Sequence, residues 1–242
     1  MLLEAMVDLG LPLRKILKNL RPFALSPSTP FVLSEAPSDS LRAGSGRVEG
    51  SIVERRTSLR AGREKGERLP RIAGELLHLV GSSPLDFQLK SMVLRVLKRL
   101  AQAEAKVHRA HWRKVRFHQL ARPDTLINIT GFCLGLRHFN VRQVYSSPIP
   151  VGSRHQGHDG RWRAGPGPAT MELLKSFPIQ RRSTRFEWTT PTGAALISTF
   201  ATPVPPPPFQ VIRIAHGFGT RRPPPFSATH PGALRLLLGR SL

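Results

Sequence analysis

Apolar side chains recur at helical spacing near the start of the chain. Two stripes, separated by Gly10 and Pro12, consist of Leu2, Leu3, Met6, Val7 and Leu9 and then of Leu13, Ile16, Leu17 and Leu20. A spacing of three and four residues marks one face of an α-helix, and glycine commonly ends a helix in the left-handed conformation. Residues 1–22 are therefore predicted to form a helical hairpin.

Residues 23–70 lack this periodicity and are rich in Pro, Ser and Arg. Only Phe31–Leu33 and Val48–Val53 have the apolar character of short strands. Such a composition buries too little apolar surface to offset an ordering entropy of ~1–2 kcal/mol per residue. We therefore expect a long, poorly ordered loop near 23–70.

Helical periodicity returns at residue 71 and is best developed over residues 87–108, where Asp86 is positioned to cap the helix. A short helix over residues 72–80 precedes it. Shorter helices are predicted over 169–176 and 190–200, and strands over 141–145, 209–214 and 233–238. Residues 71–242 are thus predicted to form one α+β domain, in which short strands pack with several better-defined helices.

Composition narrows the class of protein further. The 242 residues include a single cysteine, Cys133, which excludes an intrachain disulfide framework. No run of apolar residues approaches the ~18 that a membrane span requires. Glu4 and Asp8 stand where a signal peptide would carry basic residues, so we expect a cytoplasmic protein with no membrane partner.

The charge is strongly positive, with 37 Lys and Arg against 15 Asp and Glu and a formal net charge of +22. Such a balance is typical of proteins that bind polyanions. The basic residues are scattered, however, and the three Trp residues do not form a recognisable stacking platform. We therefore expect weak, salt-sensitive and sequence-independent binding, with no specific nucleic-acid partner.

Seven stretches of the chain, in this order, resemble the LarC family, the nickel insertion proteins of nickel-pincer cofactor biosynthesis. They are Leu100–His108, Val115–Gln119 with Asp124 and Gly131, Val144–Ser153, Pro168–Lys175, Thr190–Leu196, Gly217–Arg221 and Leu234–Gly239. In addition, Met1–Leu13 is similar to the family segment that follows an N-terminal glycine-rich motif. The resemblance covers residues 1–20 and 71–240.

The resemblance implies a reaction and its participants. Members of the family bind Ni²⁺ and deliver it to pyridinium-3,5-bisthiocarboxylic acid mononucleotide, using CTP, for which Mg²⁺ is the expected companion ion. The family also has a glycine-rich start and a C-terminal domain that are not found here, so the chain resembles a truncated, diverged N-terminal part. A separate C-terminal fragment and a second copy of the chain are the protein partners expected on this basis.

The candidate metal site consists of His118, Gln119, Asp124 and Asn128, with His118 and Asp124 as candidate catalytic residues. Imidazole and carboxylate groups suit nickel. The family pattern is His-Phe-His-Glu followed by two Asp residues, but this chain has Arg116, Gln119 and Asn128 at three of those positions. A guanidinium group repels a dication, and amide oxygens lack the charge that anchors it. The alternative is that His118 and Asp124 are surface or capping residues without a metal.

A candidate phosphate site lies at Thr190, Thr192 and Gly193, with Arg221 as a cationic partner. Backbone N–H groups at the start of a helix can bind a phosphate, although the same motif also serves as a plain helix cap.

Two further features deserve separate interpretations. His155 and His158 could bind a metal from a loop or could simply be solvated, and Cys133 is expected to be a small buried side chain.

Two other interpretations stay open. The chain is either an inactive relic of the family, because acidic and His positions have been replaced, or a basic protein that binds polyanions. Sequence alone does not separate these from a nickel insertion protein.

The composition of residues 23–70 makes a direct prediction for limited proteolysis. Trypsin should cleave first at the arginines of residues 55–68, because these lie in the segment predicted to have the least order. The measurement is a time course of trypsin digestion followed by mass spectrometry. A chain cut elsewhere while residues 23–70 stay intact would contradict the prediction.

Overall fold

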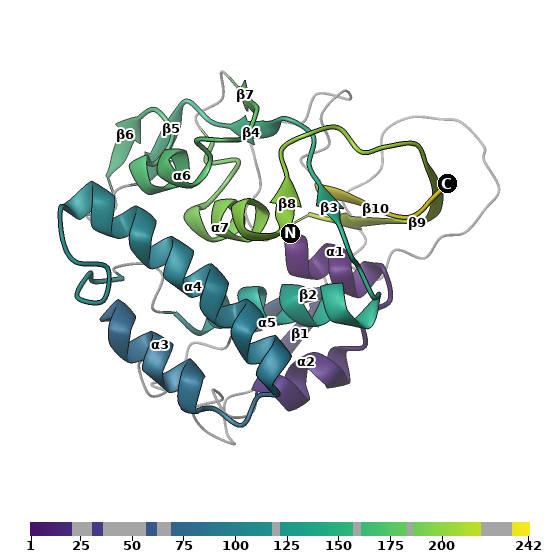
Figure 1. Cartoon of the computed structure of the whole chain (residues 1–242), viewed down its shortest axis with the longest axis horizontal. Helices are drawn as coiled ribbons and strands as arrows, with labels where there is room; N and C mark the ends of the chain where they lie inside the picture. Colours follow the sequence, from purple (N-terminus) through teal and green to yellow (C-terminus); the bar gives the residue numbers. More distant parts are fainter. Residues whose placement is uncertain are drawn as a thin grey trace.

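The computed structural model describes residues 1–20, 31–35, 57–61, 69–117, 122–156, 161–182, 186–218 and 234–242. Within them the chain is mixed α+β, as predicted (Figure 1). The helices are α1 (Leu2–Asp8), α2 (Leu13–Leu20), α3 (Ala73–Ser82), α4 (Phe87–His108), α5 (Pro123–His138), α6 (Pro168–Leu173) and α7 (Pro191–Phe200). The two helices predicted near the N-terminus are confirmed as α1 and α2, and both pack against α5.

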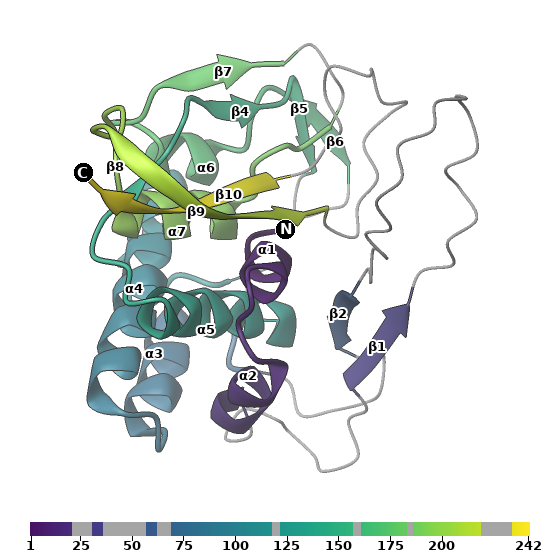
Figure 2. The same cartoon turned by 90° about the vertical axis from the view of Figure 1, so that its right-hand side faces the viewer.

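Short strands pair two by two in the described residues. The antiparallel pairs are β1 (Phe31–Glu35) with β2 (Thr57–Ala61), β5 (Arg154–Gln156) with β6 (Trp162–Ala164), and β9 (Phe209–Gly217) with β10 (Leu234–Ser241). The parallel pairs are β3 (Val144–Tyr145) with β8 (Ala201–Thr202), and β4 (Ile149–Val151) with β7 (Ile179–Arg181). Figure 2 shows β4 to β10 gathered with α6 and α7 on one side of α1 to α5, whereas β1 and β2 lie away from these strands and β2 contacts α1 and α5.

One part of the sequence-based interpretation changes. The predicted strand at Phe31–Leu33 is confirmed as β1, but its partner is β2, and Val48–Val53 lies outside the described residues. A ladder of backbone hydrogen bonds, with Val32 opposite Arg60, gives the ten residues of the two strands a regular partner. Apart from these strands and residues 69–70, the segment 23–70 lies outside the described residues, so the expectation of poor order over most of it stays a prediction.

Helix α4 is the longest helix and carries much of the core. Asp86 caps its first turn by accepting a hydrogen bond from the Leu89 amide at 3.0 Å, and Arg109 ends it in the left-handed conformation with φ of 51°. Helices α3, α5, α6 and α7 all contact α4. Its inward face is almost wholly apolar, and the buried side chains include Leu89, Val93, Val96, Leu97, Leu100 and Ala101.

Helix α5 lies between α4 and the N-terminal helices. Glycines at two positions let α1 approach closely: a Cβ atom on Gly131 would lie 2.4 Å from Leu3 Cδ1, and one on Gly135 would lie 2.7 Å from the sulfur of Met6. Because it is covered on several sides, α5 buries residues all round its axis. This explains the nearly continuous apolar run from Leu126 to Leu136.

The tight packing around Gly152 gives a testable prediction. A Cβ atom there would lie 1.7 Å from the backbone oxygen of Phe186, which a side-chain rotation cannot relieve. Gly152→Ala should cost about 1–3 kcal/mol of folding free energy. For a chain of this size, the loss should lower Tm by several degrees. Differential scanning calorimetry measures the change.

Gly81→Ala is the matched control, because nothing lies within 4 Å of the added methyl group and the position is in helix α3. Its Tm should stay level or rise, since alanine favours a helix over glycine by about 1 kcal/mol. Equal Tm losses in the two variants would show that the contact at Phe186 is not the cause.

Candidate functional site

The first turn of α5 holds two of the predicted metal-site residues. Asp124 is exposed there, directly after Pro123. The side-chain amide of Asn128 donates a hydrogen bond to the backbone oxygen of Asp124 at 2.7 Å, which leaves its Oδ1 as an acceptor. The turn therefore offers one negative oxygen ligand and one neutral one to a cation.

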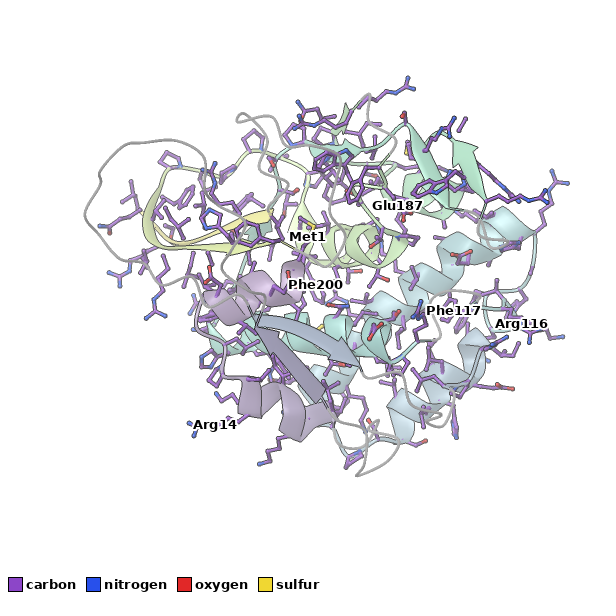
Figure 3. The ribbon with its side chains drawn as sticks, turned by 180° about the vertical axis from the view of Figure 1, so that it is seen from behind. Met1, Arg14, Arg116, Phe117, Glu187 and Phe200 are labelled. Carbon is purple, nitrogen blue, oxygen red and sulfur yellow. The ribbon has the colours of Figure 1, made fainter. Side chains whose placement is uncertain are left out.

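In the segment before α5, buried apolar side chains alternate with an exposed basic one. Val115 and Phe117 are buried, and the Phe117 amide donates to the backbone oxygen of Arg71 at 2.7 Å. Arg116 between them is exposed and pairs through its backbone with Ile72. Figure 3 shows Phe117 among the helices and Arg116 toward the periphery. Since the two alternate, Phe117 anchors the segment while the guanidinium group of Arg116 faces solvent.

His118 and Gln119, the remaining members of the predicted metal site, lie outside the described residues, as do His158 and Arg221. The structure thus places Asp124 and Asn128 together on one helical turn and leaves the ligand set a prediction. Within the described ranges, no group of three or more His, Cys, Asp or Glu side chains is arranged to hold a metal ion.

The motif Thr190–Gly193 forms the capped start of α7. Thr190 Oγ1 accepts a hydrogen bond from the Gly193 amide at 3.3 Å, and the Ala194 amide donates to the Thr190 backbone oxygen at 2.9 Å. Pro191 has no N–H group, so the amide of Thr192 is the one left in this turn for a ligand. The plain helix cap is therefore present. A phosphate here would need donors from elsewhere.

The segment leading into this cap packs against β4. Thr189 donates a hydrogen bond from its hydroxyl group to the backbone oxygen of Pro150 at 2.7 Å, and Gly152 lies against the backbone of Phe186. The rings of Phe186 and Trp188 meet edge to face, with centroids 5.4 Å apart. Two stretches that carry the family resemblance, 144–153 and 190–196, are thus brought together in space.

His155 is held by the neighbouring backbone. Its Nδ1 atom lies 2.8 Å from the backbone oxygen of Gly165. Since a carbonyl group can only accept, Nδ1 carries the proton in this contact, and neutral His155 presents the Nε2 lone pair. This is the tautomer that a metal-binding histidine uses.

Cys133 is buried in α5, and burial raises the pKa of its thiol to about 12. A thiol so resistant to ionisation is neither a nucleophile nor a metal ligand at neutral pH. The predicted role of Cys133 as a small buried side chain agrees with this environment.

Glu104 is a chemically distinctive residue that the sequence-based site omits. It is only 6% exposed on the apolar side of α4, and its Oε2 atom lies 3.5 Å from Nε2 of His108. Burial raises the pKa of Glu104, and His108 partly opposes the shift. The signal for it was in the sequence, because a carboxylate among Ala101, Ala103 and Ala105 interrupts a helix face that is otherwise apolar. Such a group can hold and release a proton.

The described residues contain no helix that is both long and apolar enough to cross a membrane.

Comparison with known proteins identifies the family. The profile of the family described as nickel insertion protein matches residues 1–241. The chain belongs to this family, and the resemblance found in its motifs is confirmed. No solved structure matches the chain.

Curated relatives agree with this assignment. A putative nickel insertion protein of Geotalea daltonii is 31% identical over 243 residues, which cover 100% of this chain and 58% of the relative. One from Syntrophobacter fumaroxidans is 32% identical, with 100% of this chain and 57% of the relative covered. The pyridinium-3,5-bisthiocarboxylic acid mononucleotide nickel insertion protein of Desulfitobacterium hafniense is 33% identical over 66% of this chain and 39% of its own length. Where the whole of this chain is matched, it spans little more than half the length of the relative.

The environment of Glu104 predicts an unusual pH dependence of stability. Folding raises the pKa of the Glu104 carboxyl group. As the pH rises from the ordinary glutamate value toward the raised value, the unfolded chain ionises first, and the folded state loses stability relative to it. Glu104→Gln should therefore stabilise the protein at pH 7, on the order of 1 kcal/mol. The gain should shrink as the pH falls below the ordinary glutamate value of 4.5. Urea unfolding at several pH values measures it.

Glu172→Gln provides a control of opposite sign. Hydrogen bonds from Lys106 and Lys175, each at 2.5 Å, lower the pKa of Glu172. This variant should lose stability at pH 7 and approach the wild type in acid. If Glu104→Gln behaves like Glu172→Gln, the carboxylate of Glu104 is stabilised in its site and our interpretation of its burial is wrong.

Proposed function

We propose that this chain supplies the nickel-handling part of a protein that inserts Ni²⁺ into pyridinium-3,5-bisthiocarboxylic acid mononucleotide. The observation that carries the proposal is the family profile, which spans residues 1–241 without leaving out a described element. The name of the Desulfitobacterium hafniense relative supports the identity of the substrate. CTP and Mg²⁺ rest on the family resemblance, and no step is derived through them.

The chemistry of the proposed substrate defines what the protein must do. Its two thiocarboxylates flank one ring carbon, so an inserted nickel ion binds two sulfur atoms and that carbon. When the nickel–carbon bond forms, the carbon–hydrogen bond breaks and a base must take the proton. Asp124, with His118 beside it in the proposal, is the candidate base, because its carboxylate is exposed and close to the candidate ligands in sequence.

The proposed site must hold nickel loosely enough to release it. Oxygen ligands on one helical turn, Asp124 Oδ and Asn128 Oδ1, bind a borderline metal more weakly than thiolates or several imidazoles would. The thiocarboxylate sulfurs of the substrate then outcompete them. The direction of transfer follows from the softness of the ligands, not from a conformational change.

The same arrangement explains why this chain is expected to bind nickel weakly. Asp124 is the only carboxylate in the predicted ligand set, whereas the family pattern supplies three, and the basic Arg116 replaces a histidine. An inactive relic would share these replacements. The two interpretations differ in whether the chain as purified carries one stoichiometric nickel ion, and restoring the family residues tests the ligand set itself.

Restoring the family residues gives the decisive test. Arg116→His, Gln119→Glu and Asn128→Asp together should strengthen Ni²⁺ binding at least tenfold, because they remove a cation and add two carboxylates. Isothermal titration calorimetry of the whole chain measures the affinity. His118→Ala in the restored background should abolish the gain.

A matched control changes the same residue types at exposed positions after α5, namely Arg142→His, Gln143→Glu and Asn140→Asp. This control reproduces the change in charge without touching the proposed site, and it should leave Ni²⁺ affinity nearly unchanged. Equal gains in both triple variants would show that net charge alone determines binding. A folded restored variant with no gain would rule out the proposed ligand set.

A further inference from the structure

Two open hollows adjoin on the outward face of α4; the larger lies beside α3, and the smaller is lined by α4 alone. They have volumes of about 620 and 280 Å³ and share Leu94 and Lys98. The larger is also lined by Leu77, His78, Trp112 and Arg113, and the smaller by Phe87, Lys90, Ser91 and Arg95. We call this continuous surface the α3–α4 groove. It is separate from the Asp124 turn and from the start of α7.

The floor of the groove is apolar and in part unusually exposed. Phe87 is 84% exposed at one end, and Leu77 and Leu94 are only partly buried along its length. Phe87 is the first residue of α4, a position where helix stability does not require an apolar side chain. Burying its ring against a partner would remove apolar surface from water and so favour association.

The charges that line the groove are all positive. Lys90, Arg95, Lys98 and Arg113 contribute four cations, and no carboxylate lines either cavity. Among the ion pairs of the described chain, none involves these four residues. The other basic residues of the same region do have acidic partners: Arg137 pairs with Asp86, and Lys106 pairs with Glu172.

In place of carboxylates, the groove cations contact aromatic rings. Lys98 Nζ and Arg113 Cζ lie 5.6 and 5.1 Å from the centre of the Trp112 ring. Arg95 lies over Phe200, with Cζ 5.6 Å from the ring centre, and donates to the backbone oxygen of Thr199 at 3.4 Å. These contacts hold the cations at the groove without neutralising them, so they can still attract an anionic partner.

The dimensions of the groove favour a protein segment as its occupant. Residues 87, 90, 91, 94, 95 and 98 recur at helical spacing and span about three turns, or roughly 16 Å at ~1.5 Å per residue. A mononucleotide is shorter than this. Nucleic acid would also leave the apolar floor unmatched, and the cations over Trp112 compete with bases for its ring.

We propose that the α3–α4 groove binds an acidic amphipathic helix of a partner protein. Leucine-type side chains of that helix would cover Phe87, Leu77 and Leu94, and its flanking carboxylates would pair with Lys90, Lys98 and Arg113. This is the helix-in-groove mode of recognition, with charge complementarity setting orientation and apolar contact setting affinity. The proposal is independent of nickel binding.

The test uses the full chain and a fluorescein-labelled, 18-residue helical peptide with Leu at positions i, i+3/i+4 and i+7 and Glu on the flanks. Fluorescence anisotropy should show micromolar binding that weakens as salt rises. Lys98→Glu and Phe87→Ser should each weaken it at least tenfold. Both side chains are on the surface of α4, and circular dichroism verifies that each variant folds.

Matched controls lie outside the groove. Arg142→Glu removes an exposed cation and Ile214→Ser removes a side chain that is 57% exposed, and neither should change the affinity by more than twofold. A peptide with Ser in place of Leu and a 20-nucleotide single strand test charge alone, and both should bind at least tenfold more weakly. Absent binding, equal binding of either comparator, or loss of affinity in the control variants would overturn the proposal.

Discussion

The burial of α5 on several sides is the constraint on which the rest of the structure depends. A helix that is apolar around most of its surface is stable in water only if other elements cover it. Helices α1 and α2 contact one side and α4 another, and the close approach of Leu3 requires that residue 131 have no side chain. The two N-terminal helices are therefore part of the core, although about fifty residues separate them from α3.

This arrangement leaves the candidate site residues at the ends of helices, where Asp124 is exposed and Glu104 is buried. Asp124 lies on the first turn of α5, Thr190 caps α7, and Glu104 lies near the end of α4. Helix ends are where backbone groups and side chains remain accessible beside a packed core. In the proposed function, ligands at such positions could exchange a metal ion without disturbing the interior.

Six of the seven described helices could be predicted from the sequence because their signals are local, whereas α5 could not, because its nearly continuous apolar run from Leu126 to Leu136 has no clear helical period. Asp86 caps α4 as its position indicates, and Thr190 and Pro191 begin α7 where the motif suggests. The strand pairings could not be predicted in this way. Val32 lies opposite Arg60 with 27 residues between them, and no local pattern distinguishes that partner from Val48–Val53. Glu104 was omitted from the predicted site because the sequence, although it shows a carboxylate interrupting an apolar helix face, does not show which elements cover it.

The ion pair of Asp86 has a consequence for how the domain opens. One oxygen of this carboxylate caps α4 through the Leu89 amide, while the other pairs with Arg137 at the end of α5. Burial alone would raise the pKa of Asp86, but these two contacts outweigh it and lower the pKa. Protonation in acid therefore releases both helix ends at once. In hydrogen exchange, the first turn of α4 and the last turn of α5 should behave as one cooperative unit, with amides that lose protection together, although 48 residues lie between Leu89 and His138 along the chain.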